Sequence, residues 1–244
     1  MTGSFNKSVS ILMPAYNEET NIENVVRKCA GALKEFGVRG EVVVTNDGST
    51  DKTGVILAEL KKDIGNLVVI EHEKNAGYGA ALSNAIKVAS GDLIVTIDSD
   101  GQFDIGELPL LLAEYNRGYR VVAGYRKKKM DSFLKVFANK VLSFFTNCLF
   151  GLKLKDANSA FKLYEGALLK SLKIESRGFQ TPTEIMVKLK NQGIEIREVG
   201  ITHAFREKGK SALSTFRTTY AMIMFFLYLK LKIYLSNKKF INEI

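Results

Sequence analysis

The first half of the chain alternates between short apolar runs and longer segments in which apolar residues recur at helical spacing. The short runs, rich in valine and isoleucine, are typical of buried strands, and the recurring pattern is typical of amphipathic helices. The strands are predicted at Ser8–Met13, Glu41–Thr45, Leu67–Glu71, Asp92–Ile97 and Arg120–Ala123. The helices are predicted at Glu19–Phe36, Lys52–Lys62, Gly79–Ala89 and Glu107–Tyr115. This order predicts βαβ units with right-handed crossovers, and therefore an α/β fold around a mostly parallel central sheet flanked by helices.

The pattern changes after Gly124. A basic cluster at Tyr125–Lys129 precedes Phe133–Phe150, in which Phe, Leu and Val share one broad helical face. The remaining elements are predicted as a strand-like segment at Asp156–Tyr164, a helix at Glu184–Gln192 and a last strand at Glu195–Val199.

The end of the chain is apolar and aromatic. Residues Tyr220–Leu229 carry no charge, and Lys230 and Lys232 then alternate with Leu231 and Ile233. A membrane-spanning helix needs about 20 apolar residues, and this segment becomes charged sooner. We therefore expect a helix that lies in the membrane interface while its lysines reach the headgroups. A buried C-terminal helix and a dimer interface are the alternatives.

Length and composition fit one α/β domain with an appendage, because the chain has 244 residues. We divide it into a domain, residues 1–216, and a C-terminal helix, residues 217–244. Cys29 and Cys148 lie far apart in helix-like segments, which predicts neither a disulfide framework nor a metal site and favours a reducing compartment. The polar start of the chain predicts no signal peptide.

The net charge of +9 predicts an anionic partner. The positive charges gather after residue 117, where many of them are interleaved with long apolar runs. No motif that docks on nucleic acid is present in the sequence. A nucleotide and a membrane surface are therefore the partners that we expect, and nucleic acid is not.

Two carboxylates close the fourth predicted strand. The run Leu93–Ile97 is typical of a strand buried in a parallel sheet, and Asp98 and Asp100 follow it on either side of Ser99, with Gln102 close behind. Ligands of open α/β sheets bind beyond the carboxyl ends of the strands. Two aspartates there can hold a hard divalent cation and the diphosphate that it carries. Two solvated loop aspartates are the alternative, and the strand context favours the metal site.

The turn after the first predicted strand can serve a nucleoside. Pro14 cannot donate a hydrogen bond to a sheet, so we expect the strand to stop there. Tyr16 can stack on a base, and Glu18 can accept a hydrogen bond from a ribose hydroxyl or a base edge. Asn17 or Glu18 can equally begin the next helix, whose first turn is acidic as the helix dipole favours.

Two further turns follow predicted strands. Asp47 and Gly48 are typical of a strand-to-helix turn, and a carboxylate at that place can also read a nucleoside. Gly77 and Gly79 open a helix, and close approach of a ligand explains them as well as close packing of the helix on the sheet. No G-x-G-x-x-G follows the first strand, which disfavours a Rossmann dehydrogenase.

Taken together, these four strand-end motifs resemble the inverting glycosyltransferase family 2, and within it the polyprenyl-phosphate (dolichyl-phosphate) hexose synthases, over roughly residues 8–215. The resemblance implies a Rossmann-like GT-A fold that binds a nucleotide-diphospho-sugar. It implies a nucleoside pocket lined by Pro14, Ala15, Tyr16, Glu18 and Asp47. It also implies that Asp98, Asp100 and Gln102 face the diphosphate and its Mg²⁺ or Mn²⁺. Asn46 stands where many relatives carry a further Asp.

The second half resembles the acceptor region of these synthases. The run Asp156–Lys162 follows the family pattern, with Ala160 and Lys162 in place of the Gly and Arg of its S-G-F-R ending. The resemblance implies that the acceptor-side segment, residues 125–155, holds the lipid phosphate through Arg126, Lys135 and Asn139. It implies that Arg206, in a loop like the family's R-x-x-G-x-S, clamps the diphosphate with its planar fork.

By this resemblance we expect inverting transfer of a hexose from UDP- or GDP-hexose to a polyprenyl (dolichyl) monophosphate, by a peripheral protein at the cytoplasmic face of a membrane. The turn D-G-S-T-D slightly favours UDP donors. The candidate catalytic residues are Asp100, Arg206 and Asp156. A phosphomonoester has a second pKa of about 6, so the nucleophile is largely anionic near neutral pH and a general base is less necessary.

Two alternatives stay open. One is a family 2 enzyme with a hydroxyl acceptor, for which Asp156 is the candidate base. The other is a catalytically silent membrane protein that binds a nucleotide sugar.

Overall fold

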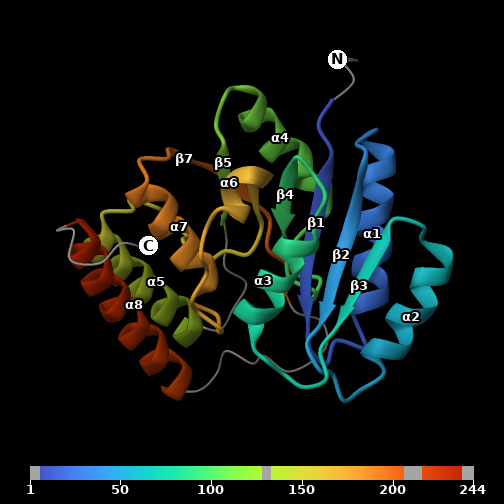
Figure 1. Cartoon of the computed structure of the whole chain (residues 1–244), viewed down its shortest axis with the longest axis horizontal. Helices are drawn as coiled ribbons and strands as arrows, with labels where there is room; N and C mark the ends of the chain where they lie inside the picture. Colours follow the sequence, from blue (N-terminus) through green and yellow to red (C-terminus); the bar gives the residue numbers. More distant parts are fainter. Residues whose placement is uncertain (1–5, 128–132, 206–215, 238–244) are drawn as a thin grey trace.

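The computed structural model describes residues 6–127, 133–205 and 216–237, and for residues 133–140, 216, 217 and 237 it describes the backbone alone. Its sheet has the strand order β3-β2-β1-β4-β6-β5-β7 (Figure 1). The strands are β1 (Val9–Ala15), β2 (Gly40–Asn46), β3 (Leu67–Glu71), β4 (Leu93–Thr96), β5 (Val121–Arg126), β6 (Lys162–Glu165) and β7 (Ile196–Ile201). The helices are α1 (Ile22–Glu35), α2 (Thr53–Asp63), α3 (Tyr78–Val88), η1 (Ile105–Glu107), α4 (Leu108–Asn116), α5 (Phe133–Phe150), α6 (Gly166–Lys170), α7 (Thr181–Asn191) and α8 (Phe216–Asn237).

The predicted α/β fold with a mostly parallel sheet is confirmed. The strands β1 to β4 pair in parallel, as do β5 and β7, whereas β6 runs antiparallel between β4 and β5. Neighbouring residues of one strand enter different cores: Ile11 packs with α1, α2 and α4, and Leu12 packs with α3, α6, α7 and α8. Because helices cover both faces, all residues of β1 are buried, which explains its unbroken apolar sequence.

The expectation that the first strand stops at Pro14 is wrong. Strand β1 continues through Pro14 and Ala15, which pair with Thr45 and Asn46 of β2. The backbone of Pro14 faces the other neighbour, β4, and β4 has already ended opposite Leu12. The N–H that proline lacks would therefore have met no strand.

The expected strand at Asp156–Tyr164 is also mostly wrong, because only Lys162–Glu165 joins the sheet. The polar residues before it bond through side chains and turns instead of a ladder: Asp156 pairs with Arg126, and its carbonyl accepts from the Ser159 N–H. The loop before Lys162 therefore does not pair as a strand, and Asp156 holds it at the end of β5.

The apolar part of helix α8 is longer than the uncharged run Tyr220–Leu229. Among the described residues, Thr218–Ser236 is long and apolar enough to cross a membrane by length and composition, so the expectation that it is too short is wrong. The reason is that the helix begins at Phe216 and continues past both lysines. One side packs on the protein through Met222, Phe226, Leu229 and Ile233. The other side exposes Tyr220, Met224, Leu227, Tyr228, Leu231 and Tyr234.

Figure 1 shows α8 beside α5 and α7, at the far side of the molecule from α1 and α2. The rings of Phe150 and Phe226 join α5 to α8 with centroids 6.3 Å apart. Glu175, in the loop before α7, holds α8 through Lys232 Nζ at 2.8 Å and the Tyr228 hydroxyl at 3.0 Å. Helix α8 is therefore docked on the domain by one face only.

Candidate active site

The turns after β1, β2 and β4 meet at the carboxyl edge of the sheet, toward the bottom of Figure 1. The Ser99 hydroxyl donates to the Pro14 carbonyl at 2.9 Å, and the Asp47 N–H donates to the Ala15 carbonyl at 2.8 Å. The Asn17 N–H donates to the Ser49 hydroxyl at 3.0 Å. These bonds bring together three motifs that are far apart in the sequence, as expected for the ends of neighbouring parallel strands.

The carboxylates of Asp98 and Asp100 project from the turn after β4. Gly101 closes this turn with a φ of 76°, and the Gln102 N–H donates to Asp100 at 3.1 Å. The Tyr78 hydroxyl, at the start of α3, donates to Asp98. Burial and then repulsion from Asp100 raise the pKa of Asp98 to about 7. Asp100 is therefore close enough to Asp98 for its charge to oppose the ionisation of that carboxyl group.

This pair fits a divalent cation. In the part of the chain that the structure describes, no group of three or more His, Cys, Asp or Glu side chains is placed to hold a metal. Magnesium and similar cations are usually bound by one or two carboxylates together with substrate phosphates. A cation beside Asp98 and Asp100 would relieve their repulsion, and a diphosphate would complete its oxygen ligands.

Two basic side chains, Arg126 and Lys162, lie close enough to Asp98 for their charges to act on it. Arg126, at the end of β5, forms a fork on Asp156, with Nε 2.6 Å from Oδ2 and Nη2 2.9 Å from Oδ1. Lys162 is fully buried and donates to the Ser159 carbonyl. Burial lowers the pKa of Lys162 to about 7, although the charge of Asp156 acts in the opposite direction. The structure thus brings Arg126 and Asp156 together and adds Lys162 to the cluster.

Two members of this cluster were missed as site residues by sequence reasoning. Tyr78 follows Gly77 at the start of a helix, and burial and then the charge of Asp98 raise its pKa well above the usual value. Lys162 is a charge within the otherwise apolar run from Ala160 to Leu163. A charged residue in a strand that must be buried on both faces is the signal that could have identified it.

The predicted nucleoside residues differ in exposure. Pro14 and Ala15 are buried in β1, whereas the Tyr16 side chain is 42% exposed and can meet a ligand. Glu18 is buried, its carbonyl accepts from the Ile22 N–H at 2.9 Å, and its carboxylate accepts from Asn21 at 2.8 Å. Glu18 lies in the turn before α1, which begins at Ile22 with Asn21 as its N-cap, so neither Asn17 nor Glu18 begins the helix. The contact of Glu18 with a nucleoside stays a prediction.

Asp47 is turned into the protein. Its carboxylate accepts hydrogen bonds from the His72 ring and from the N–H groups of Ala76 and Gly77. The neighbouring Asn46 donates to Glu71 at 2.6 Å, which an aspartate at that place could not do without protonation. A direct contact between Asp47 and a nucleoside also stays a prediction.

The two glycines at the start of α3 lie against the loop before α7. A Cβ on Gly77 would lie 2.3 Å from the Arg177 carbonyl oxygen, and one on Gly79 would lie 2.2 Å from Thr181 Oγ1. The Gly79 N–H also donates to the Arg177 carbonyl at 2.9 Å. The loop before α7 therefore packs against this turn, which requires glycine there.

The turn after β4 is joined to the turn after β7. Gln102 donates from its side chain to the Ala204 carbonyl at 2.9 Å, and Phe103 pairs with His203 in an antiparallel bridge. Among the predicted residues, Arg206 and the side chains of Lys135 and Asn139 lie outside the described residues. Their assigned roles stay predictions.

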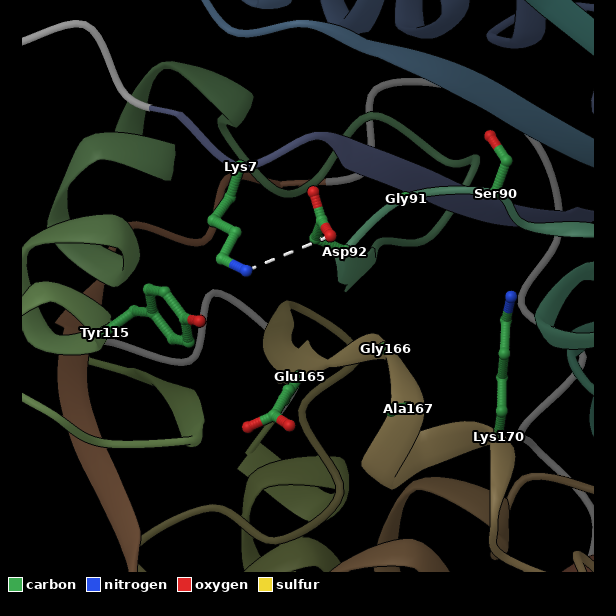
Figure 2. A pocket seen from close by; sticks show the side chains of 9 residues that line it. All are labelled: Lys7, Ser90, Gly91, Asp92, Tyr115, Glu165, Gly166, Ala167 and Lys170. Atoms are coloured by element: carbon green, nitrogen blue, oxygen red, sulfur yellow. Dashed lines mark ion pairs between the residues drawn. The ribbon is translucent and has the colours of Figure 1, made fainter.

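A hollow of about 510 Å³ lies at the opposite, amino edge of the sheet, before β4 (Figure 2). Lys7 and Asp92 face each other across it at 3.9 Å, and Glu165 pairs with Arg120 at 2.6 Å. Because β4 separates this hollow from Asp98 and Asp100, it does not belong to the candidate active site.

Curated proteins that are similar to this chain include sugar transferases. Undecaprenyl-phosphate 4-deoxy-4-formamido-L-arabinose transferases of Salmonella paratyphi A and Salmonella dublin are 26% identical over 212 residues. The match covers 86% of this chain and 64% of those relatives, so the chain spans less than two thirds of their length.

Solved structures share the fold. Glucosyl-3-phosphoglycerate synthase from Mycobacterium tuberculosis in complex with Mn²⁺ and UDP-glucose has a TM-score of 0.70 at 22% identity, covering 92% of this chain and 79% of that one. Its complex with Mg²⁺ and UDP has a TM-score of 0.69 at 21% identity, with the same coverage. Both indicate the GT-A architecture.

A family model described as "Glycosyl transferase family 2" matches residues 10–172, which include the strand-end turns, both carboxylates and the Arg126–Asp156 pair. With the fold and the site in agreement, the chain belongs to glycosyl transferase family 2.

Proposed function

We propose that this protein transfers a hexose from a nucleotide-diphospho-sugar to a polyprenyl (dolichyl) monophosphate, with inversion at the anomeric carbon. The observation that carries the proposal is the site itself, in which a carboxylate pair suited to a cation and diphosphate lies beside the basic side chains of Arg126 and Lys162. The relatives named for undecaprenyl phosphate support the class of acceptor.

On the donor side, Tyr16 offers an exposed ring on which a base can stack, and Asp98 and Asp100 face the diphosphate. A bound Mg²⁺ or Mn²⁺ would neutralise the charge that develops on the leaving nucleoside diphosphate. Arg206 is proposed to add a second positive charge there. The donor is proposed to be a UDP-hexose in preference to a GDP-hexose, on the strength of the turn D-G-S-T-D.

On the acceptor side, a phosphate oxygen attacks the anomeric carbon as the bond to the nucleoside diphosphate breaks. The protein has to align the two reactants and hold two anionic groups close together. Arg126 and Lys162 lie where they can offset that charge. Lys135 and Asn139 are proposed to hold the same phosphate.

The acceptor is a lipid, and helix α8 offers a surface for meeting it. Its outward face is apolar and aromatic, and α8 contains no acidic residue. Apolar burial and attraction to anionic headgroups would both hold such a helix at a bilayer surface. We propose that the protein lies peripherally on the cytoplasmic face.

A hydroxyl acceptor is the second candidate. It would need a general base, and Asp156 is the candidate among the described acidic residues near the acceptor side. Both oxygens of Asp156 accept hydrogen bonds from Arg126, which favours the ionised form and weakens it as a base. This pairing favours the phosphate acceptor.

The test is a panel of UDP-glucose, UDP-N-acetylglucosamine and GDP-mannose, each incubated with a short polyprenyl phosphate and Mg²⁺ or Mn²⁺. The proposal predicts that one donor yields a glycolipid and an equal amount of released nucleoside diphosphate. Excess chelator should abolish both products. Absence of glycolipid with every donor, despite nucleotide binding, would contradict it.

A further inference from the structure

His72 connects the ends of β2 and β3 to helix α3 at the carboxyl edge of the sheet. The residue follows β3, its backbone N–H donates to the Asn46 carbonyl at 3.0 Å, and its ring lies between two polar side chains. Nδ1 lies 2.7 Å from Oδ1 of Asp47, and Nε2 lies 2.8 Å from Nδ2 of Asn84 on α3. Because the amide of Asn84 donates to Nε2, the ring proton is placed on Nδ1 and is donated to Asp47.

Asp47 in turn holds the next turn of the chain. Its Oδ1 also accepts from the Ala76 N–H at 2.9 Å, and its Oδ2 accepts from the Gly77 N–H at 2.9 Å. The side chain is 4% exposed, so these bonds are formed away from water. Three donors therefore fix both oxygens of one carboxylate, which leaves it little freedom to rotate.

The backbone of the turn after β2 also lies against the backbone of the segment that leads to Ala76. Gly48 has a φ of 67°, and a Cβ added to it would lie 2.4 Å from the carbonyl carbon of Lys74. This close approach means that a shift of the turn at Ala76 must move the turn after β2 as well. The turn after β2 is bonded to the start of the Tyr16 turn through Asp47 and Ala15.

We propose that His72 is a positioning residue for the donor nucleotide: it fixes the Asp47 carboxylate, and through it the Ala76–Gly77 turn beside the nucleoside. The proposal rests on the proposed donor site and gives Asp47 an indirect role there. His72 touches neither the diphosphate nor the acceptor, so its loss should weaken donor binding and leave the acceptor KM unchanged.

Two substitutions separate the ring nitrogens. In His72→Asn the amide nitrogen takes the place of Nδ1 and can still donate to Asp47. In His72→Gln the amide reaches the place of Nε2, near Asn84, and Asp47 loses its donor. Asn66→Ala is the matched control, because Asn66 donates to the Gly40 carbonyl at 3.0 Å and joins the same two strands at their other edge.

Two readouts are needed for each variant: hydrogen exchange of the Ala76 and Gly77 amides, and the dissociation constant for UDP and GDP together with the donor KM. We expect His72→Gln to speed exchange and to weaken nucleotide binding about tenfold, with kcat little changed. His72→Asn and Asn66→Ala should stay within about twofold of wild type.

Equal effects in the two His72 variants, or exchange that changes without any change in nucleotide affinity, would overturn the proposal. Unchanged values in His72→Gln would overturn it as well. If the wild-type protein binds no nucleotide, the proposed function fails, and the exchange rates still decide whether His72 holds the turn.

Discussion

Arg126 and Asp156 form a partly buried ion pair in which two nitrogens of the guanidinium meet the two carboxylate oxygens at 2.6 and 2.9 Å. The two residues come from different elements, one from the end of β5 and the other from the loop before β6. Sequence reasoning gave them separate roles, one with the acceptor phosphate and one in catalysis. Because the two side chains are paired, a substitution of either one should also disturb the position of the other on the acceptor side.

Asp156→Asn should lower the acceptor kcat/KM about tenfold, because the amide cannot hold Arg126 with the same charge. Removal of a general base would instead cost about a hundredfold to ten-thousandfold in rate. Steady-state kinetics with a short polyprenyl phosphate distinguish the two. A loss in the larger range, with an unchanged melting temperature, would indicate that Asp156 is a base.

Asp100→Asn should lower turnover at least tenfold, a loss of about 1.4 kcal/mol or more in barrier terms, because a neutral amide cannot balance the charge of a cation and diphosphate. The measurement is the initial rate as a function of Mg²⁺ or Mn²⁺ concentration. The rate of the variant should rise less with added cation than the rate of wild type. Asp104→Asn is the control, since Asp104 begins the neighbouring 3₁₀ turn by accepting from Gly106. Full activity of Asp100→Asn, or of wild type in excess chelator, would refute the cation site.

Glu175→Gln should loosen α8 and lower the free energy of unfolding by roughly 2 kcal/mol at neutral pH. Glu175 accepts from Lys188 at 2.7 Å as well as from Lys232 and Tyr228. Burial alone would raise the pKa of Glu175, but the bonds from Lys188 and Lys232 outweigh it and hold the pKa at about 2.

Because the pKa of Glu175 is lower in the folded protein than in the unfolded chain, its ionised carboxylate stabilises the fold fully at pH values above the ordinary pKa of about 4.5. This stabilisation is lost as the pH falls from 4.5 toward 2. Denaturant unfolding at pH 7 and pH 3 should therefore show a smaller difference between wild type and Glu175→Gln at pH 3. Glu23→Gln, which breaks an exposed pair with Arg27, should cost far less stability than Glu175→Gln because water screens that pair. A constant difference for Glu175→Gln across this pH range would contradict the prediction.

The outward face of α8 should bind anionic vesicles. Leu227→Ser combined with Leu231→Ser removes apolar area from that face and should weaken binding about tenfold, and added salt should weaken it further. Val55→Ser, at a similarly exposed apolar position on α2, is the control and should bind like wild type. Protein that resists salt and alkali and requires detergent would show that α8 spans the bilayer, and protein that ignores vesicles would show that α8 packs on a partner.

Local pattern was enough to predict the parallel half of the fold and the position of two aspartates directly after β4. The alternation of apolar runs with helical spacing dictates βαβ units, and Asp98 and Asp100 carry their chemistry within three residues. Pro14 was misread because its effect depends on where the neighbouring strand ends, which no local pattern reports.

Lys162 carried a local signal, its charge within an apolar run, but the other features that the sequence did not explain depend on contacts between distant segments. Tyr78 belongs to the site only because α3 places its hydroxyl at Asp98. Gly77 and Gly79 are needed because a loop a hundred residues away, at Arg177, packs on them. His72 gains its significance from Asp47 and Asn84, which lie on two other elements. Spacing in the sequence carries no sign of these encounters.

In the proposed reaction, the nucleophile is a phosphate oxygen of a lipid. The most direct test compares a polyprenyl phosphate with the same polyprenol lacking its phosphate, in one vesicle preparation with the active donor and cation, with the product analysed by ³¹P NMR and mass spectrometry. The account predicts a sugar phosphodiester of inverted anomeric configuration from the phosphate and no product from the alcohol. A glycoside of the alcohol, or a product that retains the donor's configuration, would contradict it.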